Sequence, residues 1–443
     1  MPNHLIAAVP IHGHVAPLLP IAAQLVGRGD TVRFLTGSRF AAAVTATGAT
    51  HVPLPTEADF DDRDVAARFP QREGLSPLAA IAFDIEHIFI RPGETQYAAV
   101  TALLAAAPVD AVIVDPLFLG GALLTEVPAD QRPPVLVAGV VPLALPGRDL
   151  APFGLGVPPL AGLLGRVRNG ALRAVNARVL KSAEAAGAAI AKRVHGRSGS
   201  GPMMDWLSRA DAVVQLSVPS FEYPRPDTAT RLEFTGMVTT SSAVEHPRPA
   251  WWSDLDGSRP VVHVTQGTIA NGDLSELILP TVQGLAHDDV LVVVATGGRP
   301  VADLGPLPAN TRAAEFLPYA ELFARTDVFV TNGGYGGVQF ALAHGVPVVI
   351  APGKEDKVEV AARVVWSGTG VNLRRQRPTG ARVRRGVRRV LTDPRFRTAA
   401  SRIAAELAAA PGAAGFAAVV DDVVAHHPRP AADGATPVQR EVA

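Results

Sequence analysis

Two histidines near the N-terminus stand where a general base could act. His12 and His14 follow the apolar run Leu5–Val9, which is predicted to be a buried strand. Open α/β sheets bind their ligands in the loops at the carboxyl ends of their strands. Because imidazole titrates near neutral pH, a histidine in such a loop could take a proton from a hydroxyl group. The alternative for either histidine is a polar side chain that satisfies the start of a helix, and the residues alone do not choose.

An aspartate that could assist such a base ends the apolar run Val112–Asp115. A carboxylate behind a histidine holds one tautomer and stabilises the imidazolium, as in the Ser-His-Asp triad. Asp115 could act in this way if its strand lies close to the first strand of the sheet. The alternative is an aspartate that caps the next helix, and the residues alone favour this more common use.

A glycine-rich turn connects another strand to a helix. The run Asp327–Thr331 is β-branched, Asn332–Gly337 holds four glycines, and Val338–His344 is apolar at helical spacing. Glycines let a ligand approach the backbone, and the helix start offers free N–H groups and the positive end of its dipole. We therefore predict a phosphate-binding turn, in preference to a tight turn that needs several residues with positive φ.

The elements that must position these residues follow the order strand, helix, strand in both halves of the chain. In the first half, Pro17–Gly27 is predicted to be a helix and Thr31–Thr36 a strand. In the second half, Val261–Thr265 is a predicted strand and Leu274–Leu285 a predicted helix. Such β-α-β units build parallel sheets, so the fold class is α/β. The polar, proline-bearing segment Val238–Pro249 separates the halves and is predicted to be a linker.

Four other segments have a predicted conformation. The charged residues of Phe83–Tyr97 are predicted to form the solvent-exposed face of a helix. The alternative is that they line the acceptor cleft. Val141–Gly170 is rich in Pro, Gly and Leu and is predicted to be irregular, whereas Ala171–Arg193 is predicted to be one long helix. Gly412–Ala425 is the predicted terminal helix, and the polar tail 427–443 is predicted to be disordered.

Composition excludes several classes of protein. The 443 residues suffice for two domains, and the formal net charge of zero predicts no nucleic-acid partner. The absence of cysteine excludes disulfides, thiolate metal sites and cysteine nucleophiles. We expect no signal peptide, because the first residues lack a basic leader. We expect no stable membrane insertion, because Asp115, Pro116 and two glycines interrupt the apolar run near Ala111–Leu124. The expected location is therefore the cytoplasm. The first β-α turn lacks G-x-G-x-x-G, which argues against a dehydrogenase.

Taken together, the motifs resemble those of nucleotide-sugar glycosyltransferases of the macrolide and UDP-glycosyl type (family 1). Gly333–Asp356 carries GG-x-x-G, AL-x-x-GVP-x-x-x-x-P and D, which is similar to their donor-binding signature. GH-x-x-P at Gly13–Pro17 is similar to the motif that contains their catalytic histidine. The resemblance covers the whole chain and implies the GT-B fold, two Rossmann-like domains that face each other across a cleft.

The same resemblance implies the boundaries of the domains. Residues 1–237 would be the acceptor-binding domain and residues 251–411 the nucleotide-sugar-binding domain, with the linker at 238–250. A helix at 412–426 would return to the first domain before the tail. In the family, the segment that matches Val141–Gly170 is a mobile acceptor loop, and its apolar character suits a hydrophobic acceptor.

The resemblance also assigns roles to residues. His14 would deprotonate the acceptor hydroxyl and Asp115 would orient His14. The donor-binding residues would be Gly267, Thr268, Phe316, Leu317, Asn332, Gly333, Gly334, Gly336, Gly337, Asp356 and Lys357. Within this set, Gly267 and Thr268 would face the diphosphate or the sugar, Phe316 would stack on the base, and Asp356 with Lys357 would hold the sugar. The residues predicted to contact the acceptor are His12, Phe83 and His87.

Three usual donor contacts of the family are replaced in this chain. Asn332 stands where a histidine precedes the glycines, and Gly337 stands where a hydroxyl residue follows them. Phe340, preceded by Gln339, occupies the position of the acidic residue that grips the ribose. The resemblance therefore does not identify the sugar or the nucleotide.

The predicted function is an inverting, metal-independent glycosyltransferase of the hexosyltransferase type. It would move a sugar from a UDP- or TDP-sugar to a small apolar acceptor, such as a polyketide-like natural product of antibiotic biosynthesis. No cofactor beyond the nucleotide sugar is expected, and the protein would be a monomer or a homodimer. The replaced donor contacts motivate the alternative, a catalytically weak sugar-nucleotide-binding protein that is auxiliary to a true transferase.

Overall fold

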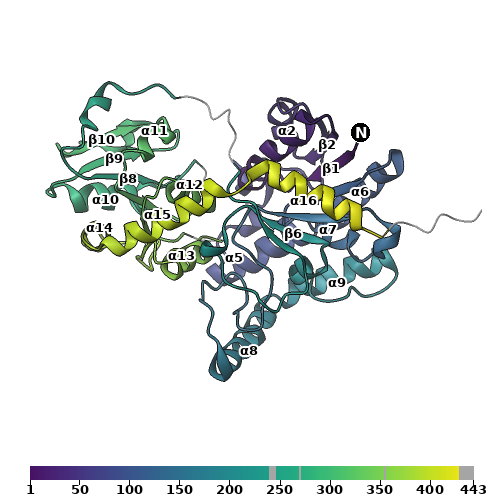
Figure 1. The fold of residues 1–443 in the computed structure, drawn as a ribbon. Helices are drawn as coiled ribbons and strands as arrows, with labels where there is room; N and C mark the ends of the chain where they lie inside the picture. Colours follow the sequence, from purple (N-terminus) through teal and green to yellow (C-terminus); the bar gives the residue numbers. More distant parts are fainter. Residues whose placement is uncertain (239–245, 269–270, 354–355, 429–443) are drawn as a thin grey trace, which may run out of the picture.

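Two parallel β-sheets organise the chain in the computed structural model, which describes residues 1–238, 246–268, 271–353 and 356–428 (Figure 1). The first sheet has the strand order β3-β2-β1-β4-β5-β6-β7, and the second has β10-β9-β8-β11-β12-β13. The first sheet consists of β1 Asn3–Ala7, β2 Thr31–Thr36, β3 Thr50–Pro53, β4 Ala111–Val114, β5 Val135–Gly139, β6 Ala212–Gln215 and β7 Leu232–Phe234. The second consists of β8 Val261–Thr265, β9 Leu291–Ala295, β10 Thr311–Ala314, β11 Val328–Thr331, β12 Val348–Ile350 and β13 Gly370–Asn372.

Helices cover the sheets and connect their parallel strands. In the first domain they are α1 His12–Val15, α2 Leu19–Gly27, α3 Ala41–Thr45, α4 Val65–Arg68, α5 Pro77–Phe83, a π-helix at Asp84–Ile90, α6 Gly93–Ala106, α7 Leu119–Leu124, α8 Gly162–Val179 and α9 Lys181–His195. The later helices are α10 Ile278–Leu285, α11 Tyr319–Phe323, α12 Tyr335–Ala343, α13 Lys357–Trp366, α14 Gly380–Thr392, α15 Pro394–Ala409 and α16 Gly412–His426. Two α/β domains with parallel sheets confirm the predicted fold class.

Successive residues of the first strand enter different hydrophobic cores. Leu5 and Ala7 pack in one cluster with Trp206, whereas Ile6 packs in another cluster with Phe416 of α16. Both faces of this parallel sheet are therefore buried, which explains why its strands are continuous apolar runs without polar alternation.

The last helix, α16, returns from the second domain to the first, as the resemblance implies (Figure 1). It packs against α2 and β6, with Phe416 and Val420 fully buried. Arg28 donates to both carboxylate oxygens of Asp421 at 2.7 Å, which holds the exposed side of α16 to the first domain. Within the described residues, no single helix is long and apolar enough to span a membrane, and only the bent pair α15–α16 passes that test jointly.

Several predicted elements differ from the observed ones. The predicted loop after β1 contains the single helical turn α1, so His12 and His14 lie on a helix. The long helix predicted at Ala171–Arg193 is two helices, because the chain bends at Leu180, where α8 ends and α9 begins. The segment predicted as irregular at Val141–Gly170 is helical from Gly162 onward. Most of the predicted linker and the tail beyond residue 428 lie outside the described residues.

Candidate functional site

The first feature of the site is a histidine–aspartate pair at the carboxyl edge of the first sheet. β1 and β4 are neighbouring parallel strands, so the residues that follow them meet at one edge. His14 Nδ1 lies 2.9 Å from Asp115 Oδ1. Both side chains are buried, with Asp115 fully so. His14 and Asp115, whose pairing required that their two strands lie close together, are therefore in direct contact.

Backbone N–H groups fix the Asp115 carboxylate in place. Val9 N donates to Oδ2 and Leu117 N donates to Oδ1, each at 2.7 Å. The helix-capping alternative is not observed, because α7 begins after Phe118 without a side-chain cap. Since an ionised carboxylate only accepts hydrogen bonds, His14 Nδ1 carries the proton, and Nε2 is the nitrogen that can receive another.

His12 lies beside the pair but has different contacts. Its side chain is exposed, and its backbone N–H donates to Asp62 Oδ2 at 2.7 Å. Partial desolvation by the surrounding residues lowers the pKa of its ring, and the nearby Arg39 guanidinium adds to this shift. The contact with Asp115 that His14 makes is thus specific to one of the two histidines.

The second feature is the glycine turn between β11 and α12. Gly333 is required by the backbone: its φ is +99°, and a Cβ there would meet Ile350 Cδ1 at 2.7 Å. The other three glycines are required by neither packing nor strain. A Cβ on Gly334 or Gly336 would meet nothing within 4 Å, and one on Gly337 would only touch Phe329 at 4.0 Å. No side chain caps the N-terminus of α12. Open backbone at an uncapped helix start suits a ligand with negative charge.

Two neighbouring loops are tied to this turn. Asn332 Nδ2 donates to the backbone oxygen of Gln266 at 2.8 Å, so Gly267 and Thr268, both exposed, lie next to the turn. On the other side, a Cβ on Gly333 would lie 3.4 Å from Lys357 Cβ.

Residue Asp356 precedes α13, and Lys357 is the first residue of that helix. Because Gly353 N donates to Asn332 O at 3.1 Å, the loop leading to α13 is bonded to the glycine turn. The structure therefore brings the predicted diphosphate and sugar contacts together at the carboxyl edge of the second sheet.

The residues predicted to contact the base occupy different environments. The Phe316 side chain is 42% exposed, and its ring stacks on His246 with centroids 4.8 Å apart. Phe316 is therefore not a core residue, and its ring is accessible to a ligand. Leu317 is 1% exposed and packs with Trp252, so its side chain belongs to the core and only its backbone could face a ligand.

The predicted acceptor contacts Phe83 and His87 stack on each other, with ring centroids 4.2 Å apart. The prediction that the charged residues of Phe83–Tyr97 form a solvent-exposed face is wrong for Glu86, which is buried. Hydrogen bonds from Ser182 and then Arg91 lower the pKa of Glu86 and keep its carboxylate charged. Glu86 thus holds the π-helix against α9 and serves the packing of the first domain.

Sequence reasoning missed a polar contact between the domains. Tyr335, the one aromatic residue in the glycine turn, donates its hydroxyl to Glu222 Oε1 at 2.9 Å. The same hydroxyl accepts from Gln215 Nε2 at 3.0 Å. Burial raises the pKa of this phenol well above its usual value. An aromatic residue inside a run of glycines was the available signal. Gln339, which precedes the position of the family's ribose-binding acidic residue, is buried at 4% exposure.

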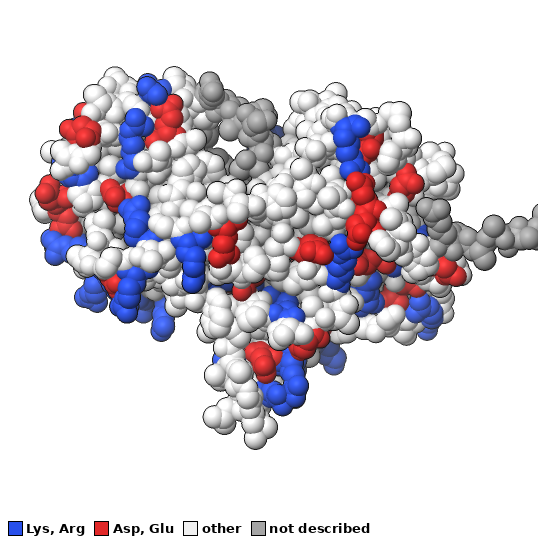
Figure 2. All heavy atoms as spheres, viewed as in Figure 1, with Lys and Arg blue, Asp and Glu red and all other residues white. Residues whose placement is uncertain are grey.

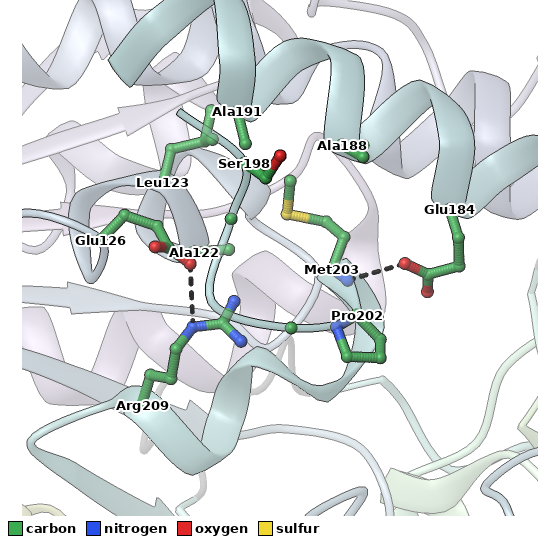
Figure 3. A pocket seen from close by; sticks show the side chains of 13 residues that line it. Ala122, Leu123, Glu126, Glu184, Ala188, Ala191, Ser198, Pro202, Met203 and Arg209 are labelled. Carbon is green, nitrogen blue, oxygen red and sulfur yellow. Dashed lines mark hydrogen bonds and ion pairs between the residues drawn. The ribbon is translucent and has the colours of Figure 1, made fainter. Parts of the chain in front are cut away.

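A separate cavity of about 280 Å³ lies in the first domain, between α7, α9 and the segment 198–209 (Figure 3). Glu126 pairs there with Arg209 at 3.4 Å, and Glu184 accepts from Met203 N at 2.8 Å. It shares no residue with the predicted site. Figure 2 shows basic and acidic side chains interspersed over both domains on the face drawn, without a large field of one sign.

Known proteins are similar to this chain along nearly its whole length. A family profile described as "Erythromycin biosynthesis protein CIII-like, C-terminal domain" matches residues 280–425. The chain is 42% identical to 4'-demethylrebeccamycin synthase of Lentzea aerocolonigenes, over 91% of this chain and 95% of the relative. It is 35% identical to UDP-glycosyltransferase 2 of Phaeomoniella chlamydospora, over 96% of each chain.

Solved structures agree in fold. The calicheamicin glycosyltransferase CalG4 superposes with a TM-score of 0.69 at 23% identity, over 96% of this chain and 99% of that one. The glycosyltransferase VinC in complex with DTDP gives a TM-score of 0.65 at 22% identity, with the same coverage. The relatives above 30% identity decide the family. The chain therefore belongs to the GT-B glycosyltransferases of the macrolide and UDP-glycosyl type (family 1), enzymes that transfer a sugar from a nucleotide sugar.

Proposed function

We propose that this enzyme inverts the anomeric centre, needs no metal ion, and transfers the sugar of a UDP- or TDP-sugar to a hydroxyl of a small apolar acceptor. The carrying observation is the contact of 2.9 Å between His14 Nδ1 and Asp115 Oδ1. Nε2 of His14 takes the proton of the acceptor hydroxyl as its oxygen attacks the anomeric carbon. The new glycosidic bond forms on the face opposite the departing nucleoside diphosphate. The buried Asp115 carboxylate stabilises the imidazolium that results.

The leaving diphosphate would be stabilised by the turn at the start of α12. Its negative charge increases as the anomeric bond breaks, and preorganised N–H groups stabilise such charge better than water does. Gly334, Gly336 and Gly337 leave this backbone uncovered. Among the described residues, no group of three or more His, Asp or Glu has an arrangement that could hold a metal ion. Metal independence is part of the proposal because the turn can supply the positive potential by itself.

An apolar acceptor is supported by exposed side chains and by the names of the relatives. Phe153 and Leu155, in the segment after β5, are 38% and 41% exposed. The names of 4'-demethylrebeccamycin synthase and of the erythromycin biosynthesis family support a natural product as the acceptor. The reaction would take place in the cytoplasm on freely diffusing substrates.

Transfer assays with defined probes test the proposal. The purified protein is incubated with UDP-glucose or TDP-glucose and either methylumbelliferone, a planar phenol, or an aliphatic alcohol of a macrolactone. An α-linked donor should yield a β-linked product by NMR, and a chelator such as EDTA should leave the rate unchanged. An α-linked product would contradict inversion, and loss of activity restored by a divalent cation would contradict metal independence. Nucleotide binding without transfer to any acceptor would favour the auxiliary role.

A further inference from the structure

Three charged side chains are buried between the two domains. Glu222 follows β6 in the first domain, and Glu359 and Arg363 lie on α13 in the second. Arg363 Nε donates to Glu222 Oε2 at 2.6 Å, and Arg363 Nη1 donates to Glu359 Oε2 at 2.8 Å. Their exposures are 2%, 4% and 1%. Buried charges are costly unless they are paired, so this interface cluster needs all three members.

Four further bonds of the interface cluster go to one segment, residues 143–156, named here the acceptor segment. At its start, Leu143 N donates to Glu222 Oε1 at 3.2 Å and Leu143 O accepts from Arg363 Nη2 at 3.0 Å. At its end, Gly154 N and Gly156 N both donate to Glu359 Oε1, at 2.9 and 2.8 Å. The acceptor segment is thus held at both ends by side chains that meet at one guanidinium.

Glycine makes the second attachment possible. Gly154 has φ +93° and Gly156 has φ +60°, the left-handed region that favours glycine. With these dihedrals, two N–H groups that are two residues apart turn toward the same carboxylate oxygen. The backbone of Gly154–Gly156 thus has the conformation that lets both N–H groups reach Glu359 Oε1.

The interface cluster also contacts the predicted donor site. Glu222 Oε1 accepts from the hydroxyl of Tyr335, which begins α12 at the glycine turn. Glu359 lies in the first turn of α13, three residues after Asp356 and two after Lys357, the residues predicted to hold the sugar. The Glu222 carboxylate therefore contacts both the glycine turn and the acceptor segment. The start of α13 carries both the predicted sugar contacts and Glu359, which binds the end of the acceptor segment.

We infer that the interface cluster is a set of positioning residues that hold the acceptor segment in register with the donor sugar. The inference rests on the proposed function and adds the device that aligns the two substrates. All its bonds to the acceptor segment use backbone atoms, so side chains such as Phe153 and Leu155 can vary without loss of the attachment. Choice of acceptor and alignment of acceptor are then separate properties of the same segment.

Variants of Glu359 test the inference in the full-length protein. Glu359→Ala removes the acceptor of two N–H groups, so the KM for the macrolactone alcohol should rise at least about fivefold, the low end of coupling between linked sites. Binding of UDP, measured by calorimetry, should change less than about twofold because the glycine turn is unaltered. Glu359→Gln keeps an oxygen for both glycines but loses the charge that pairs with Arg363, so it should restore only part of the native KM. Glu359→Asp keeps the charge but is one methylene shorter, so its KM should also lie between those of Glu359→Ala and the native protein.

A second readout does not depend on activity. Hydrogen exchange of peptides that cover residues 143–156 should be faster in Glu359→Ala than in the native protein, with Glu359→Gln between the two. Glu94→Gln is the control. Glu94, on α6, forms an exposed ion pair with Arg193 of α9 at 2.5 Å and lies outside the interface cluster. This variant should change neither exchange in the acceptor segment nor the KM for the alcohol.

Each result decides the inference. Faster exchange with an unchanged KM would show that the acceptor segment does not align the acceptor. Equal losses in UDP affinity and KM would indicate general loosening between the domains and would also overturn it. If Glu359→Ala does not fold, a native KM in folded Glu359→Asp has the same meaning. Failure of the unmutated protein to transfer sugar would be a failure of the proposed function, and the inference would fall with it.

Discussion

At the level of single residues, the contact between His14 and Asp115 determines which ring nitrogen can act. We expect His14→Ala to lower turnover about 10²–10⁴-fold, the usual contribution of a positioned base. Asp115→Asn should also lower turnover, because an amide can stabilise the wrong tautomer. The double variant should lose little more than the worse single variant, since the two residues act as a unit. The measurement is kcat with an aliphatic alcohol at saturating donor.

His12→Ala is the control for this experiment, because His12 is exposed and lacks the contact with Asp115. It should retain most of the activity, and all these variants should still bind UDP. An inactive His12→Ala beside an active His14→Ala would contradict the assignment of the base. Full activity of both variants would contradict base catalysis by either histidine.

Buried histidines make stability depend on pH. Burial lowers the pKa of His263 from 6.5 to about 4, and it also lowers the pKa of His4, where Asp30 partly opposes the shift. Between these pKa values the unfolded chain binds protons that the folded protein does not. The free energy of unfolding should therefore fall as the pH drops from 6.5 toward about 4.

Urea unfolding at about pH 7 and about pH 5 measures this effect, with a lower midpoint expected at the acidic value. His263 packs among Tyr319, Phe323 and Phe329, so His263→Phe offers an aromatic ring that does not titrate. The difference between the two midpoints should shrink in this variant. An undiminished difference would assign the pH dependence to other groups.

At the level of elements, the glycine turn before α12 is expected to bind the diphosphate. Gly334 has φ −59° and a Cβ there meets nothing within 4 Å, so Gly334→Val should fold and fill the space for phosphate. UDP binding by calorimetry should be lost. Gly170→Val on α8 is the matched control, because its Cβ also meets nothing within 4 Å. Native UDP affinity in folded Gly334→Val would place the diphosphate elsewhere.

The start of α13 is expected to hold the sugar rather than the nucleotide. Asp356→Ala should lower kcat/KM for transfer while the Kd for UDP stays close to native. Comparison of UDP with UDP-glucose in the same calorimeter separates the two contributions. A parallel loss of UDP affinity would instead assign Asp356 to the support of the loop that Gly353 N bonds to Asn332 O.

Local patterns of apolar residues predicted the strands and helices that have a clear hydrophobic pattern. They did not predict contacts between residues that are far apart in the sequence. β2 and β8 coincide with the predicted Thr31–Thr36 and Val261–Thr265, because apolar and β-branched residues make up all but one position of each strand. The short edge strand β3, which ends in Pro53, carries too weak a pattern. The bond from Tyr335 to Glu222 joins residues 113 positions apart, and no local pattern links them.

The site was predictable to the same extent. His14 and Asp115 could be paired because both follow strands, and the carboxyl ends of parallel strands lie at one edge of a sheet. The burial of Leu317 and Glu86 could not be foreseen, because it depends on partners from other elements, Trp252 in the first case and Ser182 in the second.

At the level of the whole molecule, the return of α16 makes the first domain depend on the end of the chain. Phe416 is fully buried against this domain, so Phe416→Ala should lower the free energy of unfolding by about 3–5 kcal/mol. The half-buried Val424 is the control, and Val424→Ala should cost less. Urea denaturation compares the two. Equal, small effects would mean that α16 is not part of the cooperative core.

The chain leaves the first domain and returns to it at neighbouring points. Gly412 N donates to Thr235 O at 2.7 Å, and a Cβ on Gly236 would come within 2.3 Å of Ala410 Cβ. The chain therefore leaves the first domain just after Gly236 and re-enters it at Gly412, at neighbouring points of its surface. The adjacent entry and exit also make the second domain a cassette. A chimera cut at these two points would take its choice of sugar from one parent and its choice of aglycone from the other.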